Sequence, residues 1–380
     1  MNFHDVKVLI APDKFKGSLT AQEVCETIRA GLQPIDPSLK ITALPLADGG
    51  EGTCDLLTYL DKGKRISVKV YDPLMREIHT YYGLSADGNT AFIEMAHASG
   101  LQLLQPGEAN CMIASSYGTG QMIQQAISRG AKKIIMGIGG SATMDGGLGM
   151  AEALGYKLFS SDNKPLTGNG ENLAHLNRID STEVFSLLQQ TTCIVLCDVD
   201  NPLCGEQGAA RVFARQKGAR DEEIEILEKG LSNFSRVAST LGVDFDFPGA
   251  GAAGGMGAGA ALFLNAAIKK GTDFIFDHIQ LDSKIAAADL IITGEGKLDT
   301  QTFSGKVVQG VARLAAQHRK PLLVVAGCCT LDKAQIQNMG ISHLIVLADE
   351  HVSVKQAMAG AAPLLQKKIA AWFQQNGRMS

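Results

Sequence analysis

The chain has 380 residues, 45% hydrophobic and 19% charged, with a formal net charge of −4 and a pI near 6.1. This length favours two domains over one core. The acidic balance argues against a nucleic-acid or membrane-surface function, because both need a basic patch. An aromatic content of 6% argues against a platform for stacked bases.

The sequence also bears on the cellular compartment. No apolar stretch approaches the length of a membrane span, and we expect no signal peptide. Eight cysteines occur without a CxxC pair. We therefore expect reduced thiols and a cytoplasmic protein.

The N-terminal part alternates apolar strands with helices. Residues 6–12 (VKVLIAP) predict a buried strand, and Ser18 offers the cap of a helix that ends near Leu32. A second strand is predicted at 41–47 and a second helix at 51–60. This is the start of an alternating α/β pattern.

The middle of the chain has a different pattern. Residues 67–115 look β-rich and irregular. Helix–strand units follow around 117–158, and another strand is predicted at 193–198. This change of pattern predicts a second domain.

The C-terminal third returns to the first pattern. Apolar strands are predicted at 289–296, 321–327 and 343–349. The last helix, from about Val352, carries a helical apolar stripe that Pro363 is expected to kink.

Apolar strands that alternate with helices predict a parallel sheet covered on both faces. We predict an α/β fold with a Rossmann-like doubly wound domain of residues 1–66 and 286–380, and an inserted α/β domain of residues 67–285. Ligands of doubly wound sheets bind beyond the carboxyl ends of the strands. The expected active site is therefore a cleft between the two domains.

The first strand is followed by the motif APDKFKGSLTA (11–21). It contains Asp13, Lys14, Lys16 and Ser18. Lysines next to a helix N-terminus suit the carboxylate of a small hydroxy acid or a phosphate. The alternative is a solvated turn capped by Ser18, which explains the serine better than it explains Lys16.

The motif LADGGEGTCD (46–55) follows the second predicted strand. Asp48 and Glu51 lie on a loop that glycines keep open, an arrangement that suits Mg²⁺. Helix capping is the alternative explanation, and it accounts well for Glu51. Asp48 remains the functional candidate of the pair.

Residues 132–155 (KKIIMGIGGSATMDGGLGMAEALG) predict a strand, a glycine turn and a helix. The amides of Gly139, Gly140 and Ser141 would form an anion site at the helix N-terminus. A tight turn with Asp145 as the helix cap explains the pattern equally well. The segment is not a P-loop, because it lacks the GxxxxGK[ST] lysine.

The motif VLCDVDNPLCG (195–205) carries two acids after a strand. Side chains at positions i and i+2 of an extended chain face opposite ways. We favour Asp198 as a general base or metal ligand and expect Asp200 to belong to the following turn. In FARQKGA (213–219), Gln216 and Lys217 are either phosphate contacts or surface residues.

The segment 247–264 contains the pattern GxGxxG at Gly249, Gly251 and Gly254. Asp273 follows at about the spacing of a dinucleotide fingerprint. The residues before the glycines end in Pro248, however, and make a poor central strand. We interpret the segment as an anion loop that starts a helix, or as a close-packed helix.

The strand at 289–296 leads into ITGEGKLDTQTFSGK (292–306). Its carboxyl end is predicted to gather a cluster of charged and hydroxyl side chains: Glu295, Lys297, Asp299, Thr302 and Lys306. A structural turn would explain any one of these residues but not the whole set.

Taken together, these segments resemble the type I glycerate kinase family. The resemblance covers nearly the whole chain and rests on APDKFKGSLTA, PLADGGEGT, IGGSATMDGGLGM, CDVDNPLCG, QKGA, GAGAAGGMGAG and GEGKLDTQT. It implies a two-domain α/β enzyme that transfers the γ-phosphoryl group of ATP to D-glycerate with Mg²⁺. The product of this family is typically 2-phosphoglycerate, and some glycerate kinases make the 3-isomer.

Some positions differ from the usual family pattern. Met144 stands where Asn is common, Lys14 where Ser is frequent, and Lys297 where Arg is frequent. Lysine presents a point charge and not the planar fork of arginine. A bidentate contact at position 297 is therefore not expected.

Phosphoryl transfer needs backbone amides, cations, Mg²⁺ and a carboxylate that accepts the hydroxyl proton. The catalytic candidates are Asp198, Asp48 and Lys306. The candidates for binding the acid substrate are Asp13, Lys16, Ser18, Lys297 and Asp299. The nucleotide candidates are Gly139, Gly140, Ser141, Gly251, Gly254, Gly255 and Gly257. The metal candidates are Asp48, Asp198 and Asp299, and the sequence does not decide which acid is the base.

Two other functions are compatible with parts of the sequence. The GAGAAG pattern suggests an NAD(P)-dependent dehydrogenase of a small hydroxy acid. A non-enzymatic sensor of a sugar acid or phosphate would also close around its ligand. The expected partners are D-glycerate and ATP, without nucleic acid or membrane, and a homodimer is the candidate assembly.

Overall fold

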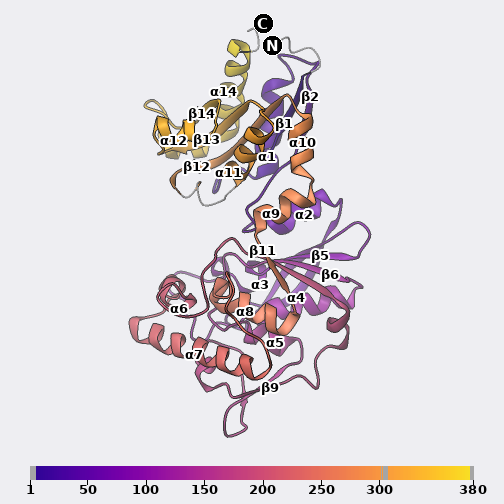
Figure 1. The fold of residues 1–380 in the computed structure, drawn as a ribbon, viewed down its shortest axis with the longest axis vertical. Coiled ribbons are helices and arrows are strands. Elements are labelled where there is room, and N and C mark those ends of the chain that lie inside the picture. The colour runs from indigo at the N-terminus through magenta and orange to yellow at the C-terminus, as the bar shows by residue number, and fades with distance from the viewer. Residues whose placement is uncertain (1–5, 301, 303–306, 377–380) are drawn as a thin grey trace. The chain divides into compact units, whose positions relative to one another are not determined.

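A computed structural model describes residues 6–300, 302 and 307–376 of the protein (Figure 1). Contacts among the described residues divide the chain into two compact units. We call residues 1–48 and 272–380 the terminal unit, and residues 49–271 the central unit. The chain thus passes from one unit to the other after residues 48 and 271. The sequence predicted these boundaries after residues 66 and 285.

The terminal unit is built on a parallel sheet with the strand order β14-β13-β12-β1-β2. Its strands are β1 (Lys7–Ile10), β2 (Lys40–Ala43), β12 (Leu290–Leu298), β13 (Leu322–Cys329) and β14 (His343–Val346). This is the flavodoxin-like variant of the doubly wound order, and it reverses direction between β1 and β12. Ligands of such sheets bind at that reversal.

Helices cover both faces of this sheet (Figure 1). Val8 and Ile10 of β1 pack with Ile28 of one helix and Leu365 of another, while Leu9 between them is buried on the opposite face. The helices of the terminal unit are α1 (Ala21–Leu32), α9 (Gly271–His278), α10 (Leu281–Ala287), α11 (Val307–Gln317), α12 (Lys333–Asn338), α13 (Val354–Ala359) and α14 (Ala361–Asn376). The predicted strands and helices of both chain ends are therefore present, with bounds shifted by a few residues.

Two predicted details of these helices are wrong. The N-cap of α1 is Thr20, whose side chain accepts from Glu23 N while the Glu23 carboxylate accepts from Thr20 N. Ser18 instead donates to the Met358 carbonyl at 3.0 Å. The last helical stripe is divided at Gly360, and Pro363 lies in the first turn of α14, where a missing N–H costs no helical hydrogen bond.

The central unit contains a mixed sheet with the order β11-β10-β6-β5-β4-β3. β5, β6, β10 and β11 are parallel, and β3 and β4 continue the sheet as antiparallel strands. Its strands are β3 (Lys64–Tyr71), β4 (Glu77–Leu84), β5 (Thr90–Glu94), β6 (Lys133–Gly137), β10 (Thr192–Leu196) and β11 (Ala267–Lys269). A smaller antiparallel sheet has the order β8-β7-β9, formed by β7 (Lys157–Phe159), β8 (Pro165–Leu166) and β9 (Arg178–Asp180). Both units are thus α/β, as predicted.

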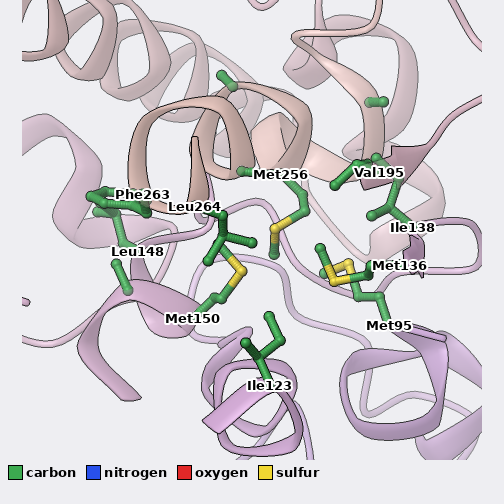
Figure 2. Packing of buried hydrophobic residues seen from close by; sticks show 14 of the residues in the cluster. Met95, Ile123, Met136, Ile138, Leu148, Met150, Val195, Met256, Phe263 and Leu264 are labelled. Carbon is green, nitrogen blue, oxygen red and sulfur yellow. The ribbon is translucent and has the colours of Figure 1, made fainter. Parts of the chain in front are cut away.

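The core of the central unit lies between its larger sheet and the helices on it. Met95, Met136, Met150, Met256 and Phe263 belong to this core (Figure 2). The helices are α2 (Thr53–Leu60), α3 (Ala96–Ser99), α4 (Tyr117–Ser128), α5 (Leu148–Ala153), α6 (Ala209–Phe213), α7 (Asp221–Thr240) and α8 (Ala252–Leu264), with short 3₁₀ turns η1 (Leu101–Leu103), η2 (Glu171–His175), η3 (Ser186–Gln190) and η4 (Arg215–Lys217).

In the part of the chain that the structure describes, every helix is too short or too polar to span a bilayer.

Candidate active site

A pocket of about 370 Å³ lies in the terminal unit, beyond the carboxyl ends of its parallel strands. It includes the reversal point between β1 and β12. Most of the acids and lysines singled out from the sequence of this unit line it: Asp13, Lys14, Lys16, Asp48, Glu295, Lys297 and Asp299. Ser18 lines it as well. The structure thus brings together residues from three motifs that are far apart in the sequence.

Asp13 stands just after β1 and is 7% exposed. Its amide donates to the Gly294 carbonyl at 2.8 Å, which fixes it to β12. Its Oδ1 accepts from the Lys14 amide at 2.6 Å. Burial, followed by the nearby charge of Asp48, raises the pKa of Asp13 to about 7. This carboxyl group therefore changes charge near neutral pH.

The end of β12 is organised by hydrogen bonds within its own motif. The Thr302 hydroxyl donates to Glu295 Oε1 at 2.5 Å, and the Asp299 amide donates to the Thr302 Oγ1 at 3.2 Å. Lys297 Nζ lies 2.9 Å from Asp299 Oδ2, and this hydrogen bond raises the pKa of Lys297. Lys306, the last predicted residue of the motif, lies outside the described residues.

The predicted metal ligands fit Mg²⁺ only if the substrate supplies further oxygens. No cluster of three or more His, Cys, Asp or Glu side chains suited to hold a metal ion is found in the described part of the chain. Mg²⁺ usually takes one or two carboxylates and completes its shell with phosphate oxygens and water. Asp13 was not among the predicted metal ligands, but after burial the charge of Asp48 is the next cause of its raised pKa, and a cation between these two carboxylates would relieve their repulsion.

In the central unit, the glycine loop of residues 49–52 lies near the carboxyl ends of β6 and β10. Gly49 has φ +89°, and a Cβ there would lie 2.7 Å from Gly271 Cα and 2.9 Å from Asp198 Oδ2. Asp198 is exposed, and its Oδ1 accepts from the Gly271 amide at 2.9 Å. Asp198 is therefore held in place at the end of β10 by the backbone after β11.

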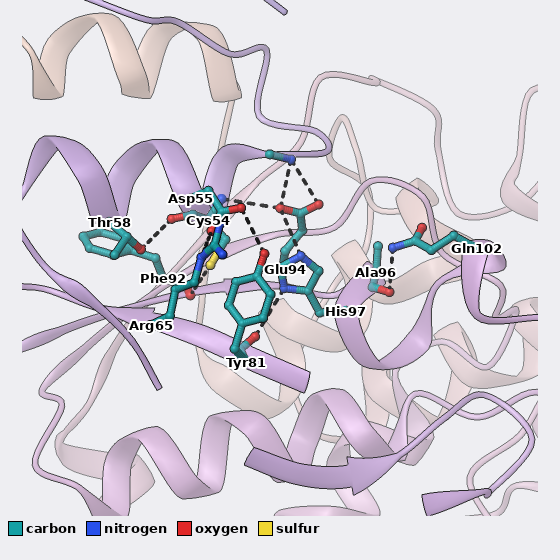
Figure 3. Close-up of polar contacts among 11 residues, drawn as sticks. Cys54, Asp55, Thr58, Arg65, Tyr81, Phe92, Glu94, Ala96, His97 and Gln102 are labelled. Atoms are coloured by element: carbon teal, nitrogen blue, oxygen red, sulfur yellow. Dashed lines mark hydrogen bonds and ion pairs between the residues drawn. The ribbon is translucent and has the colours of Figure 1, made fainter. Parts of the chain in front are cut away.

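Glu94 is a buried acid that positions this loop and that sequence reasoning missed (Figure 3). It ends β5 and is 2% exposed. The Gly52 amide donates to both of its oxygens at 3.2 and 3.1 Å, and the Cys54 amide donates to Oε2 at 3.4 Å. Glu94 thus caps α2 from another element and fixes the loop 49–52. Its signal in the sequence is an acid directly after the apolar run TAFI.

A buried lysine holds the loop after β6, where the sequence predicted an anion site. Gly139 and Gly140 are exposed, whereas Ser141 is buried. Lys217 Nζ donates to Ser141 Oγ at 2.7 Å and to the Thr143 carbonyl at 2.8 Å. Burial lowers the pKa of Lys217 to about 8. The sequence left Lys217 as either a phosphate contact or a surface residue. The surface alternative is wrong, because Lys217 is buried and its ammonium group binds the loop after β6.

Asp145 of the same loop serves the fold. It is fully buried, and its carboxylate accepts from the Ser116 amide and hydroxyl and from the amides of Gly147 and Gly149. Burial raises the pKa of Asp145 despite these bonds. The N-cap of α5 is Gly147 and not Asp145, but the Asp145 carboxylate binds two amides at the start of this helix.

The glycines of segment 247–264 allow close backbone packing. A Cβ on Gly251, Gly254 or Gly257 would lie 2.1–2.2 Å from a carbonyl oxygen of another segment or of the preceding loop. Residues 241–250, all described, form no strand before this run. The dinucleotide fingerprint is therefore absent here. Ala253, Gly254 and Gly255 have positive φ angles of 53°, 71° and 86°, so the glycines form a close-packed loop and the regular helix follows it. Nucleotide contacts of Gly251, Gly254, Gly255 and Gly257 stay a prediction.

Another pocket, of about 490 Å³, lies in the central unit beyond β10 and β11. Its lining includes Cys197, Val199, Phe247 and Lys270. Lys270 Nζ lies 3.4 Å from Asp200 Oδ2.

Comparison with known proteins places this arrangement in a family. Residues 8–375 match the sequence model of the Glycerate kinase family. A glycerate kinase of Haemophilus influenzae is 44% identical over 338 residues, covering 88% of this chain and 89% of the relative. A glycerate 2-kinase of Escherichia coli is 41% identical, covering 94% of each chain.

A solved structure agrees with these matches. It is a crystal structure from Salmonella typhimurium, of a protein assigned as glycerate kinase 2, with a TM-score of 0.88 and 38% identity. It covers 99% of this chain and 100% of its own. The chain therefore belongs to the glycerate kinase family and is a phosphotransferase.

Proposed function

We propose that this glycerate kinase transfers the γ-phosphoryl group of ATP to the 2-hydroxyl of D-glycerate with the help of Mg²⁺. Membership of the glycerate kinase family supports glycerate as the acceptor and phosphoryl transfer as the reaction. The name of the Escherichia coli relative, glycerate 2-kinase, supports the 2-hydroxyl as the acceptor.

The observation that carries the proposal is the pocket of the terminal unit. It combines the carboxylates of Asp13 and Asp48 with the ammonium groups of Lys16 and Lys297. Catalysis of phosphoryl transfer consists mainly of positioning and charge neutralisation. Lysines bind phosphate oxygens, and a carboxylate pair binds the cation that the phosphates bring with them.

The chain's residues then have separate tasks. Asp13 and Asp48 would hold Mg²⁺, which when bound neutralises the charge that develops on the transferred group. Lys16 and Lys297 would attract the anionic groups of the substrates, and Lys306 is proposed for the same task from its motif. Asp198, exposed after β10 and fixed by the Gly271 amide, is our proposal for the general base. The cleft between the domains stays a prediction.

The two rival functions lose support. A dehydrogenase needs its glycine fingerprint between a strand and a helix, and the glycine run of α8 has no strand directly before it. A sensor of sugar acids would need no ATP, and the family of the chain consists of kinases.

A coupled assay tests the proposal. D-glycerate and ATP should release ADP, and NAD(H) should give no turnover. Asp198→Asn should lower kcat by about 10²-fold or more while changing the melting temperature little, because asparagine keeps an acceptor for the Gly271 amide. The matched control is the exposed Asp200→Asn, which should retain turnover.

Two results would count against this assignment. Full activity of Asp198→Asn would remove that residue from the chemistry. Thermal stabilisation by D-glycerate without release of ADP would favour the sensor.

A further inference from the structure

The pocket of the terminal unit has two chemically different halves. One half carries the acids and lysines described above. The other half is apolar and comes from the end of β14 and from α13 and α14: Leu347, Val354, Ala357, Met358 and Ala361. A site for a small, fully polar acid would have no use for this second half.

The apolar half contains side chains that the fold does not bury. Val354 is 50% exposed and Met358 is 44% exposed, and they stand one helical turn apart on α13. Ala357, on the same helix, is buried in the core. These two exposed side chains give the pocket an apolar wall opposite its charged half.

The apolar half is fixed relative to the lysine loop. The Ser18 hydroxyl donates to the Met358 carbonyl at 3.0 Å. Gly17 has φ +73°, and a Cβ there would lie 3.1 Å from Met358 Cε. The side chain of Met358 therefore lies against the loop that carries Lys16, so one ligand can contact both.

Size and shape distinguish the two substrates of a glycerate kinase. A volume of about 370 Å³ falls in the range of about 300–1,000 Å³ that holds drug-sized ligands. Glycerate is much smaller and has no apolar face. ATP has a flat aromatic base joined to a triphosphate, and methionine sulfur packs well against aromatic rings.

We propose that this pocket is the ATP site, with the adenine base against Val354 and Met358 and the triphosphate toward Lys16 and Lys297. The inference rests on the proposed kinase function and names the substrate that the pocket takes. It changes the expectation from the sequence, which gave Asp13, Lys16, Ser18, Lys297 and Asp299 to the acid substrate. These residues would instead serve the phosphates and their cation.

The test is calorimetric binding of ADP and of tripolyphosphate, each with Mg²⁺ and without glycerate, to the full chain. The double variant Val354→Ala with Met358→Ala should weaken ADP binding about tenfold, because the base loses its apolar wall. Tripolyphosphate binding and the KM for glycerate should stay within about twofold. Both side chains are half exposed, so folding should be unaffected.

The matched control is Val199→Ala, which removes a 40%-exposed apolar side chain from the pocket of the central unit. ADP binding to this variant should equal that of the wild type. Unchanged ADP binding in the double variant, or an equal loss of ADP and tripolyphosphate binding, overturns the inference. Weakened ADP binding in Val199→Ala alone would move the base to the central unit and also overturn it.

Failure of the kinase function would look different. It would appear as absence of ADP release by the wild type in the coupled assay. The calorimetric comparison needs no turnover, so it still decides where adenine binds.

Discussion

The Asp13 carboxyl group is buried next to another acid, Asp48. Its ionisation therefore destabilises the folded protein when no cation is bound. Its pKa is about 7 in the folded chain, against 3.8 for an ordinary aspartate. Between these two values the folded state binds more protons than the unfolded state. The stability that Asp13 contributes is therefore complete below about pH 4 and is lost as the pH rises through 7.

Asp13→Asn should remove this dependence. Measured without Mg²⁺, the variant should melt about 3–8 °C above the wild type at pH 8, and the gap should close toward pH 4. The same variant should lose turnover at every pH. Asp200→Asn, an exposed control, should show no gap that grows with pH. A variant less stable than the wild type at pH 8 would contradict the raised pKa of Asp13.

Single residues also show how far the sequence leads. Asp13, Asp48 and Lys297 were recognisable because each belongs to a motif with several charged neighbours. Glu94 is a lone acid after a strand, and its partners, the amides after Gly49, belong to a segment some 40 residues away. The burial of Lys217 likewise depends on tertiary packing, which the pattern QKGA does not encode.

At the scale of elements, apolar runs predicted the strands of both chain ends well, because parallel strands buried on both faces are uniformly apolar. Helix starts were predicted less well. Ser18 and Thr20 both fit a cap, and Glu23 selects Thr20 because it stands three residues later. The glycine run of α8 was ambiguous, since anion loops and close-packed helices use the same residue.

A pair of glycine variants distinguishes a packing function of the glycine run from a function in anion binding. Gly254 has φ +71° and Gly88 has φ +74°, but a Cβ meets the Thr143 carbonyl at 2.2 Å in the first case and nothing within 4 Å in the second. Gly88→Ala should cost about 1 kcal/mol of stability from backbone conformation alone. Gly254→Ala should cost about 3 kcal/mol or more, because backbone must move.

The comparison is made by thermal melting without nucleotide. If Gly254→Ala is as stable as Gly88→Ala but has a raised KM for ATP, the loop is a nucleotide contact and its packing function is secondary.

At the scale of the whole molecule, each unit places its candidate groups after the carboxyl ends of parallel strands. Asp13 and Lys297 do so in the terminal unit, and Gly139 and Asp198 in the central unit. The alternation of apolar strands and helices in the sequence predicted this placement. It could not predict the strand order, because apolar runs carry no information about which strands are neighbours.

The central claim is that this chain phosphorylates the 2-hydroxyl of D-glycerate with ATP. Carbon-resolved NMR of the product tests it directly, because coupling to phosphorus identifies the carbon that bears the new ester. The account predicts phosphorus coupling that marks the ester at carbon 2, with one ADP released per ester formed. An ester at carbon 3, or unchanged D-glycerate in the presence of ATP and Mg²⁺, would contradict it.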